Sequence, residues 1–224
     1  NNGHFDWQGG QLYLGNGTQF QNNGVFEVSG NSGIYNNGGA ASLFTNSGQF
    51  NVNDGAVVAT NNPFVNQGGT ITADGSLSFT GGNAVFNGGS LVGTGDINIA
   101  SNATFNGAFQ SSSVNFTGGT FTGNAAVLNG AADFVAGTFS GSWEVSEVST
   151  LRTLGGSNKL LMGADFTNNG GFDWQGGQLY IGNGTEFVNN GRITATSDSG
   201  VYANGGAASS FVNKGLIEKT GGTG

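Results

Sequence analysis

The stretch Thr18–Gly24 reads TQFQNNG, and Ser42–Gly48 reads SLFTNSG, so that Phe, Asn and Gly stand at every second position. The same Phe-x-Asn-x-Gly pattern begins at Phe20, Phe44, Phe64, Phe166, Phe187 and Phe211, and where the motifs follow one another their spacing is about 21 residues. A repeat this short is typical of one coil of a β-solenoid and is too short for a pair of helices. The pattern therefore predicts stacked coils of β-strands.

A longer repeat contains this short one. The run FDWQGGQLYLGNGT at 5–18 returns as FDWQGGQLYIGNGT at 172–185, and 32 of 48 residues agree when 1–48 is aligned with 168–215. Residues 1–167 then form one full long repeat of eight coils, and 168–224 begin the next copy. We expect about 11 coils in all, with 1–224 forming a single continuous solenoid segment of a longer tandem array.

The two long copies indicate which side chains point inward. Alternate residues are kept from one copy to the other (Thr18, Phe20, Asn22, Gly24), whereas Gln19 becomes Glu186 and Gln21 becomes Val188. Alternation with a period of two is the pattern of a strand with one packed face and one solvated face. The retained residues are therefore predicted to face the core.

Stacked coils would place these inward residues in ladders. Phe20, Phe44 and Phe64 would follow one another at about 4.8 Å per rung. Asparagines in register (Asn22, Asn46, Asn66) would hydrogen-bond amide to amide along the axis. The Gly that ends each motif is expected to supply the positive φ of a tight corner.

The composition excludes several classes of protein. Of 224 residues 45 are Gly, 8% are charged and none is Cys, and the net charge is -8. Without a Gly-X-Y period the chain is not collagen, and without Cys it has neither disulfides nor thiolate metal sites. The five scattered basic residues form no patch for nucleic acid. No apolar run approaches the length of a membrane span or of a signal peptide, so any targeting segment would lie outside this sequence. The fold class expected is all-β, a parallel β-helix that is right-handed by the crossover rule.

An acidic row is the first candidate site. Asp54, Asp74 and Asp96 follow Phe44, Phe64 and Phe86 by ten residues, where FNGG at Phe86 is a weaker form of the motif, so they could align on neighbouring coils about 5 Å apart. Such carboxylates would suit Ca²⁺, the one cofactor that the sequence suggests. The alternative is that these residues belong to Asp-Gly turns with solvated side chains.

Outward-facing residues of the long repeat are the second candidate site. Trp7 and Trp174 share the inward parity of their strands with Phe5 and Phe172, so we expect them in the core. Tyr13 and Tyr180, with Asp6 and Asp173, fall on the outward parity. An exposed aromatic ring beside amides and a carboxylate can stack on a sugar ring, which indicates ligand binding, with glycans as the ligand class. The alternative is that they are ordinary surface residues.

Catalytic residues are scarce. The single histidine, His4, becomes Gly171 in the second copy, and no Ser-His or Cys-His pair is possible around it. Arg152, Lys159 and Asp165 are the one cluster that combines acid and base. The sequence therefore predicts that the protein is not an enzyme.

Three runs resemble a known class of repeats: GSLVGTGDINIASNATF at 89–105, NNGGFDWQGGQLYIGNGTEFVNNG at 168–191 and FVNKGLIEKTGGTG at 211–224. They are similar to the Gly/Asn/Thr-rich repeats of very large secreted bacterial β-solenoid adhesins and autotransporter-passenger-like proteins. The resemblance implies an extracellular or cell-surface location and a role in adhesion or as a fibre.

The function expected is structural: a stalk, fibre or matrix filament that self-associates end to end or laterally. The alternative is an adhesin whose surface binds glycans. Neither nucleic acid nor insertion into a membrane is expected for this segment.

Overall fold

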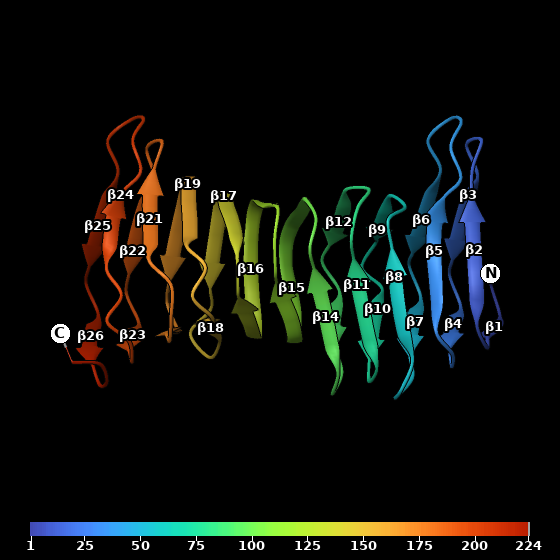
Figure 1. The fold of residues 1–224 in the computed structure, drawn as a ribbon, viewed down its shortest axis with the longest axis horizontal. Helices are drawn as coiled ribbons and strands as arrows, with labels where there is room; N and C mark the ends of the chain where they lie inside the picture. Colours follow the sequence, from blue (N-terminus) through green and yellow to red (C-terminus); the bar gives the residue numbers. More distant parts are fainter. Residues whose placement is uncertain (224) are drawn as a thin grey trace.

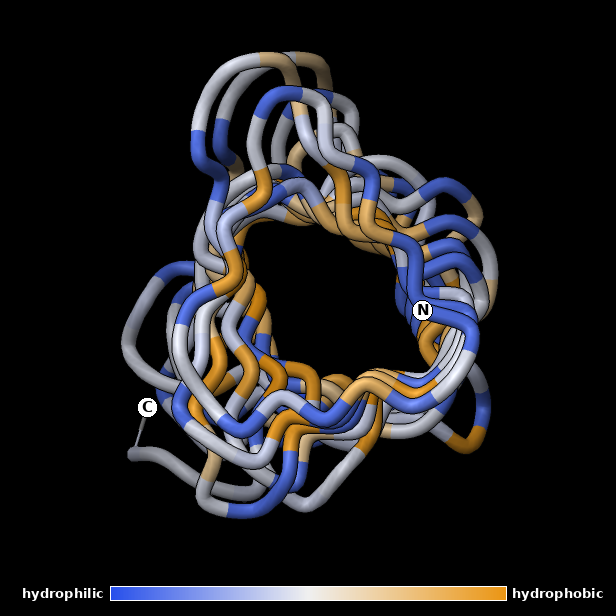
Figure 2. Tube along the Cα trace, turned by 90° about the vertical axis from the view of Figure 1, so that its right-hand side faces the viewer, coloured by the Kyte–Doolittle hydropathy of each residue, from blue (hydrophilic) through white to orange (hydrophobic). Residues whose placement is uncertain are grey.

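The computed structural model, described for residues 1–223, contains β-strands and no helix. The strands lie in parallel, coil upon coil, and the chain winds right-handed into a rod whose N-terminal and C-terminal coils lie at opposite ends (Figure 1). This confirms the predicted β-solenoid. Each coil has three strand positions, which stack into three columns along the rod; the view down the axis shows their roughly triangular outline (Figure 2).

Short strands build both ends of each column. The first column contains β1 (His4–Trp7), β4 (Val25–Val28), β7 (Gln49–Val52), β10 (Thr70–Ala73), β13 (Ser90–Val92), β22 (Glu186–Asn189) and β25 (Ser210–Asn213). The second contains β2 (Gly10–Leu14), β5 (Ser32–Asn36), β8 (Val57–Thr60), β11 (Ser76–Phe79), β14 (Asp96–Ile99), β18 (Thr150–Thr153), β20 (Gly171–Trp174), β23 (Arg192–Ala195) and β26 (Leu216–Lys219). The third contains β3 (Gln19–Asn22), β6 (Leu43–Asn46), β9 (Phe64–Asn66), β12 (Ala84–Asn87), β21 (Leu179–Gly182) and β24 (Val201–Ala203).

Long strands build the middle of the rod. They are β15 (Ala103–Phe116), β16 (Thr120–Phe134), β17 (Gly137–Val145) and β19 (Lys159–Asn168). Strands β15 and β16 each run through all three columns, with register shifts at the corners, and β17 and β19 each run through two. The full Phe-x-Asn-x-Gly motif is absent between Phe64 and Phe166, and within this region β15 and β16 turn their corners inside continuous strands.

The ladders predicted from the alternating residues are present. The rings of Phe20 and Phe44 stack with centroids 4.8 Å apart, and those of Phe44 and Phe64 with centroids 5.2 Å apart. The Asn22 amide donates to the Asn46 carbonyl, and the Asn46 amide donates to the Asn66 carbonyl, both at 2.8 Å. All three asparagines are fully buried. The side chains inside the rod thus form a packed core, which the tube of Figure 2 leaves undrawn.

The Gly that ends each motif has a different role from the one expected. Of the six motif glycines only Gly68 has a positive φ. A Cβ on Gly48 would lie 2.1 Å from the carbonyl oxygen of Gly24 in the coil below, and a Cβ on Gly215 would lie 2.0 Å from that of Gly191. The expectation of a positive φ was therefore wrong for most of them: the position needs Gly because two coils approach backbone to backbone.

Candidate functional site

The structure does not form the predicted acidic row. Asp96 begins β14 and stacks on Ser76, not on Asp74. The carboxylate of Asp74 instead accepts hydrogen bonds from the backbone and hydroxyl of Thr94, both at 3.0 Å. Asp54 lies in the turn after β7. The coils differ in length at their corners, so an equal distance from a motif Phe does not give an equal height on the rod.

Metal ligands are also not gathered elsewhere in the described chain. Among residues 1–223, no three His, Cys, Asp or Glu side chains come together as a group that could hold a metal ion. The three aspartates predicted for Ca²⁺ are thus separate surface residues.

The structure separates the aspartates of the second candidate site from its tyrosines. Asp6 lies on β1 and accepts a hydrogen bond from Gln8 at 2.9 Å, whereas Tyr13 lies on β2, in the next column around the corner. Asp173 lies on β20 between Arg152 and Thr194 of the neighbouring coils, and Tyr180 lies on β21. The carboxylates and the tyrosines therefore face different sides of the coil.

Each tyrosine instead pairs with another tyrosine of the neighbouring coil. Tyr13 and Tyr35 occupy matching positions on β2 and β5, with ring centroids 6.0 Å apart. Tyr180 and Tyr202 repeat the arrangement on β21 and β24, with centroids 5.5 Å apart. Tyr13 is 58% exposed and Tyr202 is 49% exposed. Tyr13 therefore faces outward as predicted, and Tyr180 is half-buried and alternates with the buried Leu179 and Ile181, so that it faces outward too; each has an aromatic neighbour.

Tyr35 and Tyr202 were missed by the sequence analysis, although a signal for them exists. Both Gly33 and Tyr35 are retained in the second copy, as Gly200 and Tyr202, while Ile34 between them becomes Val201 and Asn36 after them becomes Ala203. A Cβ on Gly33 would lie 2.2 Å from the Tyr35 ring, because the ring folds back over that glycine. The retained Gly-x-Tyr thus marks a ring that lies against the sheet.

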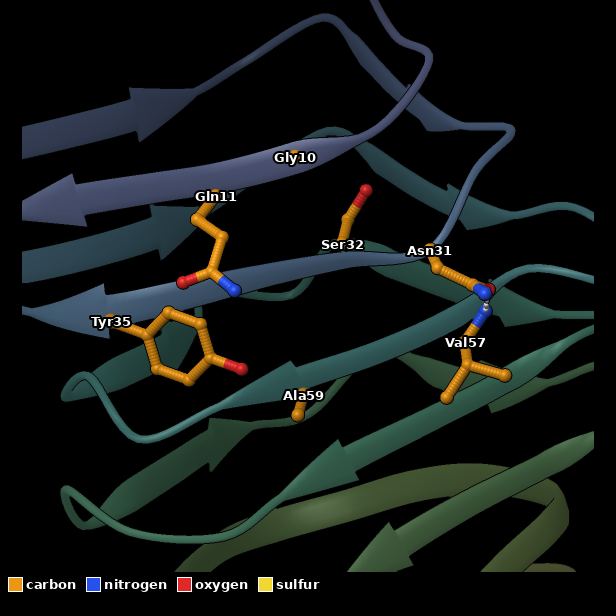
Figure 3. Close-up of a pocket in the computed structure, with 7 residues that line it drawn as sticks. All are labelled: Gly10, Gln11, Asn31, Ser32, Tyr35, Val57 and Ala59. Carbon is orange, nitrogen blue, oxygen red and sulfur yellow. Dashed lines mark hydrogen bonds between the residues drawn. The ribbon is translucent and has the colours of Figure 1, made fainter.

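A shallow hollow of about 420 Å³ adjoins the first tyrosine pair. It is lined by Gly10, Gln11, Asn31, Ser32, Tyr35, Val57 and Ala59, from strands β2, β5 and β8 and the turn before β5 (Figure 3). Gln11 accepts a hydrogen bond from the Tyr13 hydroxyl at 2.8 Å, which fixes the amide. Figure 3 shows the nitrogen of this amide directed into the hollow, beside the Tyr35 ring. A second hollow, of about 260 Å³, adjoins Tyr202 between β21, β24 and the loop 205–209.

The predicted acid-base cluster is not assembled. Arg152 forms a bidentate ion pair with Asp133 at 2.6 and 2.9 Å. Lys159 is fully buried, and its ammonium donates to the carbonyls of Leu154 and Ser157 at 2.8 and 2.6 Å. Burial lowers the pKa of Lys159. Each basic side chain therefore has a separate structural partner.

Comparisons with known proteins add no identity. No protein family, no curated protein and no solved structure matches the chain. Within the part of the chain that the structure describes, no helix has the length and apolar character of a membrane span. The functional conclusion therefore depends on the chain's own geometry.

Proposed function

We propose that this chain is a structural extracellular repeat protein, a segment of a stalk, fibre or matrix filament built by stacking solenoid coils. One observation carries the proposal: the second long copy stacks on the first without a break in hydrogen bonding or core. Phe172 stacks on Leu151, Ile181 on Leu161 and Phe187 on Phe166, one pair in each column. A further copy would add to the rod in the same way, because each coil contacts only its neighbours.

The length of a longer rod tests this proposal. A chain with two or three 167-residue repeats should appear in electron micrographs as a straight rod. Its length should grow by about 40 Å for each added repeat, at about 4.8 Å per coil. Separate globules, or a length that does not scale with repeat number, would overturn the proposal.

End-to-end association of the 224-residue segment is part of the same proposal, since the apolar side chains of its terminal coils are those on which further coils would stack, in the same chain or in a second one. The first coil exposes Phe5, 39% accessible, and the last exposes Leu216 and Ile217, 51% and 45% accessible. Unpaired strand edges with apolar side chains favour pairing with another chain. Sedimentation velocity over a range of concentrations should show linear oligomers, and Ile217→Lys should reduce them; a monomer at all concentrations would remove this part of the proposal.

An extracellular or cell-surface location is part of the same proposal. Its support is the resemblance to secreted bacterial solenoid repeats. Antibody against the chain should label intact cells that make the protein. Labelling only after permeabilisation would contradict it.

A second candidate function is that of an adhesin module that binds carbohydrate on the same solenoid. The observation that favours it is the pair of exposed Tyr13 and half-buried Tyr35 beside a hollow lined by amides and hydroxyls. Aromatic rings with a few fixed polar groups are the usual lining of a site for a small organic ligand. Direct binding of oligosaccharides, described below, tests it.

A further inference from the structure

The two long copies occupy the three columns differently. Phe5 stands in the first column, whereas its equivalent Phe172 stands in the second. From β1 to β20 the chain passes through 25 successive strand positions, because β15 and β16 each span three columns and β17 and β19 two. Three positions make one coil, so the 167-residue repeat contains eight and one third coils, and not the eight that the motif spacing suggested.

The twist of the rod compensates for the extra third of a coil. Relative to the columns, the second copy starts one third of a turn ahead of the first. A twist of the columns by about 14° per coil in the opposite sense would cancel this offset. Neighbouring strands in sheets are rotated by about 10° to 35° relative to each other, so a twist of this size is ordinary. Figure 1 shows this cancellation: β2 and β5 at one end and β21 and β24 at the other face the viewer. The loops 37–42 and 204–209 both extend upward, and the view down the axis shows long loops projecting on that same side (Figure 2).

Both tyrosine pairs therefore lie on one side of the rod. We define the tyrosine face as Tyr13, Tyr35, Tyr180 and Tyr202, which lie on those four strands. Equivalent residues are separated along the axis by about 40 Å, at about 4.8 Å per coil. The repeat length thus produces a row of similar sites that point the same way.

The chemistry of the face selects one kind of partner. Neither hollow is lined by a charged residue, and the first offers the amides of Gln11 and Asn31 and the hydroxyl of Ser32 beside an aromatic ring. Aromatic faces pack against C–H surfaces, and fixed amides bond hydroxyl groups, so an uncharged sugar matches both. The net charge of -8 opposes polyanions.

We propose that the tyrosine face binds an uncharged polysaccharide that extends along the rod and contacts both tyrosine pairs at once. This inference rests on the carbohydrate-binding function proposed above. The linked sites gain affinity because binding at one pair raises the effective concentration of the same polymer at the other.

Affinity electrophoresis of the 224-residue chain tests binding itself. Native gels would contain hydroxyethylcellulose, laminarin or galactomannan, with alginate as the charged comparison. At least one uncharged polymer should retard the chain, and the variant with all four tyrosines changed to Ala should migrate as in a gel without polymer. The matched control is the double variant Asp6→Asn and Asp173→Asn, which changes repeated outward residues on the strands that precede β2 and β21 and should remain retarded. Circular dichroism would verify the fold of each variant.

The variant Tyr13→Ala with Tyr35→Ala tests whether both pairs bind one polymer. It should bind the polymer at least about tenfold more weakly than the unchanged chain. By calorimetry, a tetrasaccharide of the same sugar should bind the remaining pair with an unchanged Kd and half the stoichiometry.

The outcomes separate the two proposals. Failure of every uncharged polymer and its tetrasaccharide to bind overturns the carbohydrate-binding function and with it this inference. If the tetrasaccharide binds but the variant Tyr13→Ala with Tyr35→Ala loses only twofold in polymer affinity, the two pairs do not bind one polymer. That result overturns this inference and leaves the carbohydrate-binding function standing. Self-association in sedimentation velocity that disappears in the four-tyrosine variant, without sugar binding, would assign the face to a second copy of the chain and overturn the proposal.

Discussion

Asn46 donates its side-chain amide to the side-chain carbonyl of Asn66 at 2.8 Å and accepts the amide of Asn22 at the same distance, inside a core that excludes water. Asn46→Ala should therefore leave one donor of Asn22 and one acceptor of Asn66 without partners. At about 1 to 3 kcal/mol for each orphaned group, the free energy of unfolding should fall by about 2 to 6 kcal/mol. Urea denaturation followed by circular dichroism measures this loss.

Asn168 supplies the matched control for that ladder. It is the first rung of the second ladder, where it stacks on Val145, and its buried carbonyl has no hydrogen-bond partner. Its amide donates to Asn189 at 2.7 Å. Asn168→Ala removes the unpaired carbonyl of Asn168 together with the hydrogen bond that its amide donates to Asn189. It breaks one amide bond of the ladder where Asn46→Ala breaks two, so it should lower the free energy of unfolding by less. Equal losses would mean that the cavity, and not hydrogen bonding, determines the cost.

The core could be predicted from the sequence because comparing the two long copies residue by residue shows which positions are retained and which change. Phe20, Asn22 and Phe44 are retained, whereas Gln19, Gln21, Leu43 and Thr45 change, and this alternation with a period of two marks the inward face of a strand. The acidic row could not be predicted in the same way. Its register depends on how many residues each corner uses, and the Asp54 and Asp74 corners differ from the one before Asp96.

The tyrosine pairs illustrate a second limit. Their outward orientation follows from parity, but the pairing of Tyr13 with Tyr35 requires the register of β2 on β5, across the loop between them. The extra third of a coil was hidden for a similar reason. Strands β15 and β16 turn their corners without the Phe-x-Asn-x-Gly motif, so the number of corners in this region could not be counted from the sequence.

Gly48 provides a test of the close approach between coils. In Gly48→Ala the new Cβ would lie 2.1 Å from a backbone oxygen of the coil below, and backbone cannot move aside as a side chain can. We expect a loss of more than about 3 kcal/mol, in the range of severe core substitutions. Gly156→Ala is the control, since a Cβ there meets nothing within 4 Å. A melting temperature of Gly48→Ala equal to that of Gly156→Ala would contradict the close contact.

Ala125 carries local backbone strain at a corner of β16. Its φ of 51° lies in the left-handed region, which costs a residue with a Cβ about 1 to 2 kcal/mol. Ala125→Gly should therefore stabilise the chain by up to about 1 kcal/mol after the greater flexibility of Gly in the unfolded chain is subtracted. Thermal unfolding measures the gain. The control is Ala126→Gly at the buried neighbouring residue, which should destabilise the chain. A melting temperature of Ala125→Gly below that of the unchanged chain would show that the corner is not strained.

Lys159 makes stability depend on pH in the alkaline range. Burial lowers its pKa in the folded chain below the unfolded value of about 10.4. Between these two values the unfolded chain binds more protons than the folded chain, so the free energy of unfolding should rise with pH across that window. Lys159→Met removes the titrating group, and the other lysines are common to both chains. Urea denaturation of both proteins from about pH 8 to pH 10.5 should therefore show the unchanged chain gaining stability relative to the variant as the pH rises. A difference that stays constant across this range would mean that the carbonyls of Leu154 and Ser157 hold the proton on Lys159 as firmly as water does.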